Sequence, residues 1–588
     1  MGKRSRDVAV SFVLAGIVIF CRPLTLEAAE VYYLGQGSTA GGAPDVNKTF
    51  TLEDRVDDLL DFKNYGNYGP DRSGMITGSV MEEINFNATG GNGTKTFLRR
   101  GVYQNTEVNI NSYEKLISDY SFESQLFLRR TDDRRIERRK DLRVKQLTTQ
   151  ISNPDNMLLF GDFYGDFSQF TLGNSLEGFN AEIKEYDSVH LQGVAARSQS
   201  PDNDMSAFWR NVYGGKTDIF LFKEEGEEAF KTFRIGTQAV TNRDDRATSD
   251  STGLGTPIPD MSNTVVSVDG EIATKEYFSL IYELGTSYHN LDERKAAYSD
   301  DKHGNAFRAR PRLKYGPFTG TYLFYYVQPK FYTDAGSAMP DKMQHQGTLD
   351  YDITKKMRAT VTENYYWNHL TGSTLKKRTI YDEKYMTLNM RPYESDPSFS
   401  VRAYTNVQER RSDDVFNTLR AVTYTPGVAV NDNLDDKTSY GIFGEFRGFI
   451  DKYVKSNSDY FYRLGTNLGR EQYILKRRAY LSGYLNLDYH DPKKYPKEDF
   501  NTGVGFQGQY NIYGAHMLYF GYNVNSSDSN QPMQNYFNYT TFFEMNFLME
   551  KKRSTRLVFR GEHNDYNQQD KEQSYDETRF ITKLVSNF

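Results

Sequence analysis

Cysteine is almost missing from this chain: Cys21 is the only one in 588 residues. It lies in a segment that we expect to be removed on export, so the mature chain would contain no cysteine. Disulfide bonds, cysteine-ligated metal sites and covalent attachment of c-type haem are therefore excluded from within the mature chain. We predict no cofactor, and any redox chemistry would belong to a partner protein.

Long apolar runs are lacking after the first thirty residues. The mean hydropathy is −0.71, and a membrane-spanning helix would need about 20 consecutive apolar residues, so helical spans are excluded. A membrane is still compatible with this value. In a transmembrane β-barrel only every second residue faces lipid, so each strand carries a thin apolar face while the average stays low.

Catalytic motifs are also absent. The chain has no G-x-x-x-x-G-K-[ST], H-E-x-x-H or G-x-S-x-G pattern and only eight histidines. His563 with Asp565, beside the predicted loop before the last strand, is the one pair similar to the sites of enzymatic barrels. Two polar residues in a Tyr- and Asn-rich loop are more often simply solvated. We predict that the protein is not an enzyme.

The N-terminus has the pattern of a secretory signal. Basic residues precede the apolar run Val8–Phe20, and small residues follow at Ala28–Ala29. The run is too short to cross a bilayer, so we assign residues 1–29 to a signal peptide. Removing its four basic and two acidic residues takes the formal charge from −6 to −8, which is mild for this length and indicates no nucleic-acid partner.

The chain that follows is rich in two-residue periodicity. In Arg478–His490 alternate residues are apolar and polar, and the same split recurs in Val401–Gln408, in Leu518–Asn525 and in Phe543–Met549. Aromatic residues make up 14% of the chain, with 44 Tyr and 39 Phe, which suits the aromatic girdles of a membrane barrel. The sequence therefore favours an all-β transmembrane antiparallel barrel; a secreted β-sandwich array or β-helix is the alternative.

Turn lengths set the strand count. Short turns, predicted to be periplasmic, alternate with longer polar segments such as Lys330–Lys342, predicted to be outer loops. Both chain ends lie in the periplasm only if the number of strands is even, which requires Arg420–Val430 to be a strand. We predict 26 strands over residues 74–588, with 24 as the alternative, the first near Met75–Phe86 and the last at Arg579–Phe588. The short turns are expected at Tyr315–Pro317, Thr354–Lys356, Pro392–Pro397, Asn511–Ala515 and Glu550–Ser554.

Residues 30–73 have a different character. Leu52–Phe62 places apolar residues at helical spacing among aspartates. We predict a short amphipathic periplasmic helix on a flexible lead, capping the rim, inserting into the barrel or docking a partner. The segment is too small for the globular plug of a TonB-type receptor.

In the last segment, Thr578–Phe588, the apolar residues Phe580, Leu584 and Phe588 fit a series of every second place, which Thr582 and Ser586 interrupt. In this it resembles the class of Gram-negative outer-membrane barrels, whose final strand usually ends in an aromatic residue. The resemblance implies location in the outer membrane, contact with its lipid and lipopolysaccharide, and recognition of Phe588 by the barrel-assembly machinery.

A basic stretch lies in a predicted extracellular loop at Arg129–Arg143. Guanidinium groups bind phosphates bidentately, so the stretch could contact lipopolysaccharide or other anions; alternatively, its own acidic residues make it an ordinary solvated loop. Asp432, Asp435 and Asp436 could bind calcium, but their irregular spacing favours a simple acidic turn. The residues predicted to contact lipopolysaccharide or anions are Arg129, Arg130, Arg134, Arg135, Arg138 and Arg139.

Phe160–Phe179 carries a "GD…FSxFTL…LxG" pattern. It resembles a segment of some large outer-membrane barrels, including usher-like ones. Its four glycines permit sharp bends or close backbone approach. We expect this segment to fold inside the barrel or to form a bulged strand pair.

Barrel width suggests the function. Twenty-six tilted strands enclose a backbone cylinder roughly 50 Å across, which would defeat the membrane barrier if left open. In size, strand number and Tyr-rich texture the mature chain resembles the porin component of porin–cytochrome conduits, which implies a barrel enclosing a periplasmic multihaem cytochrome. Some such porins carry a Cys pair near the mature N-terminus, which this chain lacks. A diffusion porin with a loop-narrowed lumen, and a secretion or assembly pore, are the alternatives.

Overall fold

The structure is a computed structural model of the whole chain. It describes residues 74–588, apart from gaps at 93–94, 117–118, 135, 138–139, 186–187, 199–208, 224–230, 245–260, 275–276, 291–301, 371–377, 394–397, 414–418, 495–497, 530–534 and 551–553. The predicted signal peptide and the predicted N-terminal helix lie outside the described residues.

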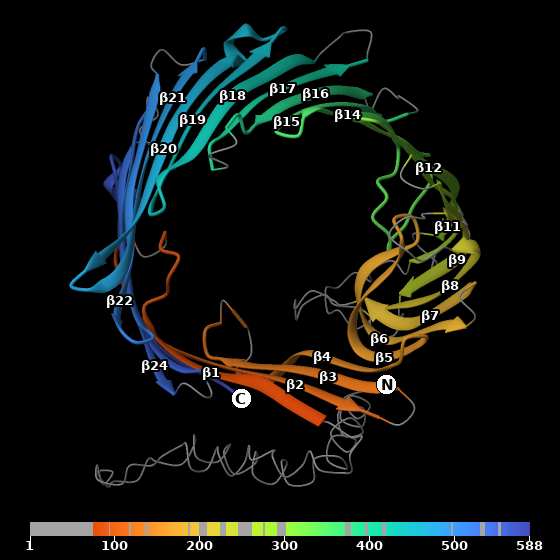
Figure 1. Cartoon of the computed structure of the whole chain (residues 1–588), viewed down its shortest axis with the longest axis horizontal. Helices are drawn as coiled ribbons and strands as arrows, with labels where there is room; N and C mark the ends of the chain where they lie inside the picture. The colour runs from red at the N-terminus through yellow and green to blue at the C-terminus, as the bar shows by residue number, and fades with distance from the viewer. Residues whose placement is uncertain are drawn as a thin grey trace.

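The described residues form one 26-stranded antiparallel barrel (Figure 1). Each strand pairs with its neighbours in sequence, and β1 pairs with β26 to close the ring. The predicted count of 26 is confirmed, and Arg420–Val430 lies within β18. The strands are β1 Gly74–Gly91, β2 Gly101–Lys115, β3 Ser121–Thr131, β4 Arg143–Ser152, β5 Asn156–Ser168, β6 Leu172–Glu185, β7 Val189–Ser198, β8 Arg210–Lys223, β9 Lys231–Asp244, β10 Ser262–Thr274, β11 Phe278–Asn290, β12 Lys302–Tyr315, β13 Phe318–Val327, β14 Lys342–Thr354, β15 Met357–Asn368, β16 Thr379–Met390, β17 Ser400–Ser412, β18 Arg420–Asp435, β19 Thr438–Asp451, β20 Asp459–Ile474, β21 Arg477–Pro492, β22 Asp499–Tyr513, β23 His516–Asp528, β24 Tyr536–Glu550, β25 Thr555–Gln568 and β26 Tyr575–Asn587.

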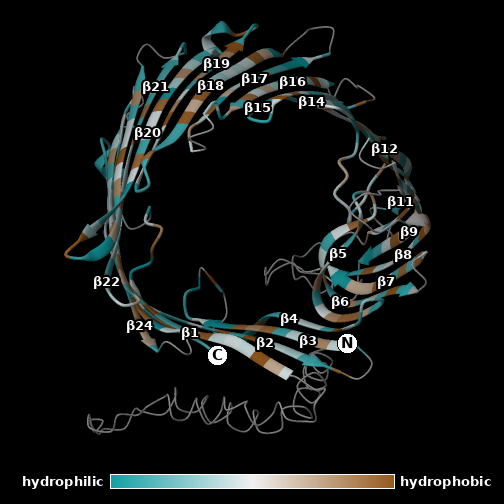
Figure 2. Ribbon diagram, in the orientation of Figure 1, coloured by the Kyte–Doolittle hydropathy of each residue, from teal (hydrophilic) through white to brown (hydrophobic). Residues whose placement is uncertain are grey.

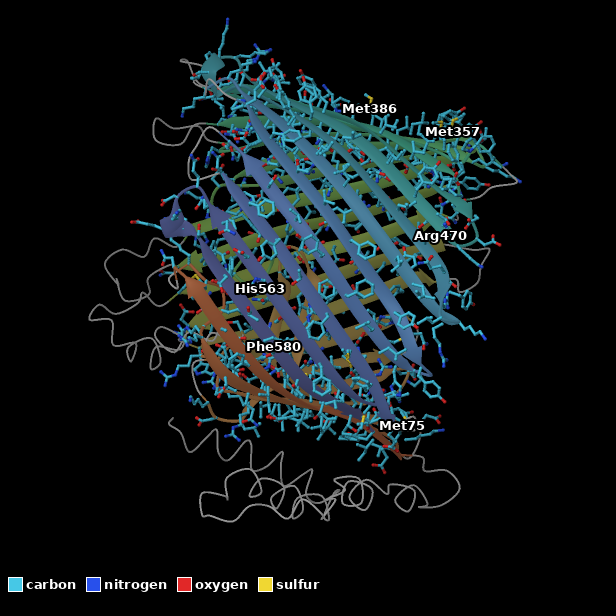
Figure 3. The ribbon with its side chains drawn as sticks, turned by 90° about the vertical axis from the view of Figure 1, so that its left-hand side faces the viewer. Met75, Met357, Met386, Arg470, His563 and Phe580 are labelled. Atoms are coloured by element: carbon cyan, nitrogen blue, oxygen red, sulfur yellow. The ribbon has the colours of Figure 1, made fainter. Side chains whose placement is uncertain are left out.

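The strands cross the wall at a steep tilt (Figure 3). Met75, Met357 and Arg470 lie toward the end where short turns join the strands, as at Gly316–Pro317 between β12 and β13. The predicted turns at Tyr315–Pro317, Thr354–Lys356 and Asn511–Ala515 are confirmed, and those predicted at Pro392–Pro397 and Glu550–Ser554 lie partly outside the described residues. Besides the strands, the described residues include the 3-10 turns η2 (Lys455–Asn457) and η4 (Lys571–Gln573), and they contain no helix of the length and apolarity needed to cross a membrane.

Alternation sorts the side chains onto two faces. Paired residues on neighbouring strands point to the same side, so the register places Val428, Gly444 and Leu464 on one face and Gly427, Glu445 and Arg463 on the other. The first face carries large exposed apolar side chains, Val428 at 48% and Leu464 at 53% exposure. Apolar and polar residues alternate along the ribbons in the same way (Figure 2). We identify the apolar face as the outside of the barrel.

The seam between the first and last strands is closed tightly at Phe588. Its backbone exchanges two hydrogen bonds with Gly78, N to O distances of 2.9 and 3.0 Å. A Cβ at Gly78 would lie 2.7 Å from the Phe588 ring, so the ring rests directly on the glycine backbone. A larger residue at position 78 would push this ring away.

The inner face is not uniform. On one side of the ring β5 and β6 curl away from the wall into the interior (Figure 1). There they bury apolar side chains against the inward faces of β7 to β13. Two clusters result: Phe167, Leu172, Leu176, Val194, Ala196, Val212, Val240 and Ala335 form the first, and Phe170, Val265, Ala306, Tyr325, Val327, Phe331 and Ala338 the second.

Candidate functional site: the lumen wall

The β5–β6 hairpin is the largest feature inside the barrel. Phe170, at its tip, is completely buried. Its ring lies 5.6 Å from the ring of Phe331 and 6.0 Å from that of Tyr325, centroid to centroid. The pairing of β5 with β6 shifts register between Asp166 and Ser168. The expectation of an in-barrel fold or a bulged strand pair at Phe160–Phe179 is confirmed on both counts.

Glycines allow the hairpin to lie close to the wall. A Cβ at Gly178 would come within 2.5 Å of the Ala196 Cα on β7, and one at Gly165 within 2.8 Å of the Leu172 side chain. Gly161 has φ +100°, a value that L side chains rarely adopt. Glycine is therefore required at Gly161, where the hairpin leaves the wall, and at Gly178, where the hairpin packs against β7.

Polar anchors hold the tip in place. Ser168 donates a hydrogen bond to the buried carboxylate of Glu283 on β11. The Thr171 hydroxyl donates to Gln238 Oε1 at 3.1 Å, and the Gln238 amide donates to Asp269 Oδ1 at 3.2 Å. Because a buried polar group without a partner costs about 1–3 kcal/mol, these bonds favour one position of the hairpin on the wall.

A charged network continues from these anchors. Arg234 on β9 bridges Asp218 on β8 and Asp269 on β10. All three face the lumen and are largely covered, with side-chain exposures of 10 to 15%. This network crosslinks three strands beneath the hairpin. This network could not be predicted from the sequence, because its members are separated by up to 51 residues and each has the composition of an ordinary lumen residue.

The segment between β13 and β14 also lies inside. Lys330–Lys342 was predicted to be a polar outer loop; it does join β13 and β14 at the end opposite the short turns, but it folds into the lumen instead of extending into water. Phe331 and Ala335 are almost fully buried. The Gly173 amide donates to the Ala335 carbonyl at 2.7 Å, and the Ser337 amide donates to the Gln169 carbonyl at 2.9 Å. Apolar residues draw the segment onto the hairpin, and backbone bonds fasten it there.

The rest of the inner wall is polar and open to water. Its inward side chains on β14 to β26 are mostly Asn, Gln, Thr, Ser, Tyr and paired charges. Tyr480 is 44% exposed, whereas Val212 and Val240 under the hairpin are each 1% exposed. Hydrogen bonds run laterally along this wall, as from Gln344 to Asn364 at 2.8 Å. The lumen thus has a dry, covered side and a wet, uncovered side.

The predicted arginine cluster is only partly gathered in a loop. Arg129 lies in β3, faces the lumen and forms an ion pair with Glu107 at 2.8 Å. Arg130, the next residue, lies on the outer face and is paired with Thr106 of β2. Arg134 is exposed in the connection to β4. Lipopolysaccharide contact by this stretch remains a prediction. Three further predicted residues, Arg135, Arg138 and Arg139, lie outside the described residues.

The other candidate groups are not assembled into sites. His563 lies on the outer face of β25 (Figure 3), where its Nδ1 contacts the Thr578 hydroxyl at 2.8 Å. Asp432 lies in β18, opposite Tyr440, and accepts hydrogen bonds from Ser398 and from the Asn433 amide. Within the described part of the chain no group of three or more His, Cys, Asp or Glu residues is arranged to hold a metal ion.

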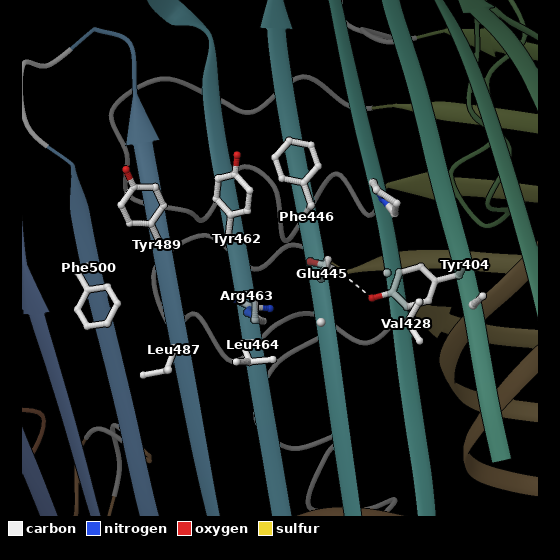
Figure 4. Close-up of a pocket in the computed structure, with 14 residues that line it drawn as sticks. Tyr404, Val428, Glu445, Phe446, Tyr462, Arg463, Leu464, Leu487, Tyr489 and Phe500 are labelled. Atoms are coloured by element: carbon white, nitrogen blue, oxygen red, sulfur yellow. Dashed lines mark hydrogen bonds between the residues drawn. The ribbon is translucent and has the colours of Figure 1, made fainter. Parts of the chain in front are cut away.

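A pocket occurs on β17 to β22 (Figure 4). Most of its lining residues, including Phe446, Leu464 and Phe500, belong to the outer face. Beneath it the Tyr404 hydroxyl donates to Glu445 at 2.7 Å across the inner face. An apolar depression on this side suits acyl chains rather than a polar solute.

An apolar outer face, a polar inner face and a sheet without free edges together decide the architecture. The molecule is a large barrel of the transmembrane type. No protein-family model and no curated protein matches the sequence. The solved structures to which it is similar include the translocation pore of the P pilus usher PapC (8% identity, TM-score 0.34, covering 87% of this chain and 99% of that one), the siderophore receptor PirA of Pseudomonas aeruginosa (9%, 0.38, 87% and 80%) and the outer membrane protein OprD of Pseudomonas aeruginosa (9%, 0.26, 87% and 94%). With TM-scores this low, the function has to be argued from the chain's own residues.

Proposed function

We propose that the protein is an outer-membrane channel with a wide aqueous lumen. The observation that carries this proposal is the contrast between the two faces of the same strands. Val428 and Leu464 present apolar side chains outward, and Arg463, one residue from Leu464, faces inward in an ion pair with Asp488 at 3.0 Å. A charged pair at this position requires water or protein inside the barrel.

The width of the barrel supports a more specific role. Twenty-six strands give a backbone diameter of roughly 50 Å. Among the described residues, the hairpin and the β13–β14 segment cover the wall from β7 to β13. We propose that the remaining lumen encloses a periplasmic partner, with a multihaem cytochrome as the first candidate, and that the barrel acts as its sheath.

A diffusion porin is the second candidate. The inward hairpin favours it, because a fixed element inside the lumen narrows the path of a solute. A secretion or assembly pore is a third possibility for a lumen of this width. All three are channels, and they differ in what fills the barrel.

Two measurements test the proposal. The purified barrel in a planar bilayer should give a large conductance with weak selectivity, and purification from native membranes should bring down a stoichiometric periplasmic protein that stains for haem. Small, discrete conductance steps without a companion would reject the sheath and support the diffusion porin. Protein that stays soluble without detergent would overturn the membrane channel itself.

A further inference from the structure

Strand β12 places a row of basic side chains in the lumen. Arg308, Arg310, Arg312 and Lys314 occupy alternate positions, and Leu313 between them is 60% exposed on the outer face. On the same inward face of β12, the row is preceded by Ala306, which is buried under the hairpin. It therefore starts at the hairpin and runs down the inner wall to the short turn at Gly316, which is on the predicted periplasmic side.

Two members of the row have uncharged residues directly across from them on the neighbouring strands. In the register with β11, Arg310 stands opposite Ile281 and Arg312 opposite Ser279. On the β13 side Arg312 stands opposite Thr321. Both arginines are exposed. Neither side chain makes an ion pair, hydrogen bond or ring contact with any residue that the structure describes.

Arg402, Arg410 and Arg447 on the inner wall contact aromatic side chains, and Arg556 has no side-chain partner among the described residues. Most of the other arginines on this wall are placed differently. Eight of them lie within 4.0 Å of a carboxylate, so their charge is compensated inside the protein. These pairs are Arg129 with Glu107, Arg210 with Asp244, Arg234 with Asp269, Arg358 with Asp352, Arg463 with Asp488, Arg478 with Glu471, Arg560 with Glu544 and Arg579 with Glu83.

The upper end of the row is tied to the hairpin. Arg308 stands directly opposite Glu283 in the β11–β12 register, and Glu283 accepts the hydrogen bond from Ser168. The charge of Arg308 is thus directed to the carboxylate that anchors the hairpin tip. Arg310 and Arg312, one and two steps further along the same face, remain available to the lumen.

We propose that Arg310 and Arg312 form a binding site for small anions carrying phosphate or carboxylate groups on the lumen wall. Residues two apart on a strand are about 6.6 Å apart, so two guanidinium groups can bind one phosphate or two linked ones. Guanidinium binds such oxygens through paired N–H donors. Clustered positive charge at a lumen wall also raises the local concentration of anions. This inference rests on the proposed channel, because its ligand would arrive through the lumen.

The test measures binding separately from conduction. Calorimetry on the full barrel in detergent, with inorganic pyrophosphate as the probe, should show binding that weakens with added salt. The R310Q/R312Q variant should bind at least about tenfold more weakly, since two charge-assisted contacts are lost. The matched control R463Q/R478Q also removes two positive charges, but from another part of the wall. It should bind pyrophosphate as the wild type does. Heat-dependent gel migration checks that each variant is folded.

A second measurement uses the reversal potential in a KCl gradient across a planar bilayer. R310Q/R312Q should shift it toward cation selectivity by more than the control. Absence of pyrophosphate binding by the wild type, or equal binding by R310Q/R312Q, would overturn the anion site. A barrel that binds pyrophosphate in detergent but does not conduct would instead reject the channel and leave the site standing.

Discussion

At the scale of single residues, alternation decides which way a side chain points but not what it meets. The alternation of apolar and polar positions in Arg478–His490 predicts its two faces correctly. It does not predict that Ser168 reaches Glu283, a residue 115 positions away. Such contacts depend on how far the hairpin bends into the lumen, and that bend is set by packing between distant strands.

Glycines under the hairpin offer a test of this packing. Gly178→Ala should lower the thermal stability of the folded barrel, because the new Cβ would lie 2.5 Å from the Ala196 Cα, which is backbone and cannot move aside cheaply. Overpacking of this kind costs about 1–3 kcal/mol. The loss of heat-modifiable gel migration with temperature measures it.

The neighbouring strand supplies the control. A Cβ at Gly193 on β7 meets nothing within 4 Å, so Gly193→Ala should leave the transition temperature unchanged or raise it slightly. Equal behaviour of the two variants would show that the hairpin does not pack on β7 as described.

At the scale of elements, the strands were the most predictable part. A two-residue period with short turns was enough to place Arg420–Val430 as a strand and to reach the correct count. The inward folding of the Lys330–Lys342 segment was not predicted, because its polar composition resembles that of a loop extending into water. Only Phe331, Ala335 and Ala338, spaced through the segment and buried in the structure, indicated that it packs inside.

Cysteine labelling tests the two faces of one strand. On β21, Asn486 faces the lumen and Leu485 faces outward at 36% exposure. In intact outer membranes Asn486→Cys should react with a charged maleimide at least about ten times faster than Leu485→Cys, since lipid excludes the reagent from the outer face. The expected absence of other cysteines from the mature chain keeps the background low.

Detergent provides the check on this result. Solubilisation followed by denaturation should make the two cysteines react at similar rates. Faster labelling of Leu485→Cys in membranes would reverse the assignment of the faces, and with it the lumen that the proposed function requires.

At the scale of the whole molecule, closure depends on the pairing of β1 with β26. Replacing Phe588 by Ala removes the ring that rests on Gly78, and deleting it also removes two backbone hydrogen bonds. We expect both changes to lower the amount of folded barrel in the outer membrane, the deletion more strongly, with increased degradation in the periplasm. Immunoblots of unheated samples measure the folded fraction.

Phe559→Ala on β25 is the matched control, because Phe559 is also an outward aromatic residue but lies away from the chain end. It should have a smaller effect on assembly. If loss of Phe588 changes folded levels no more than this control does, the C-terminal residue is neither an assembly signal nor an essential part of the seam.

The hairpin covers the wall on one side, so the cross-section of the interior is asymmetric, although the ring of strands is not. A round object wide enough to fill the barrel would collide with β5 and β6, so a partner that fills the remaining space must sit off the axis, toward β14 to β26. Its rotation about the axis is then fixed as well, because only one of its sides can face the hairpin. The barrel would therefore select an enclosed partner by the asymmetric shape of the partner's cross-section as well as by its diameter.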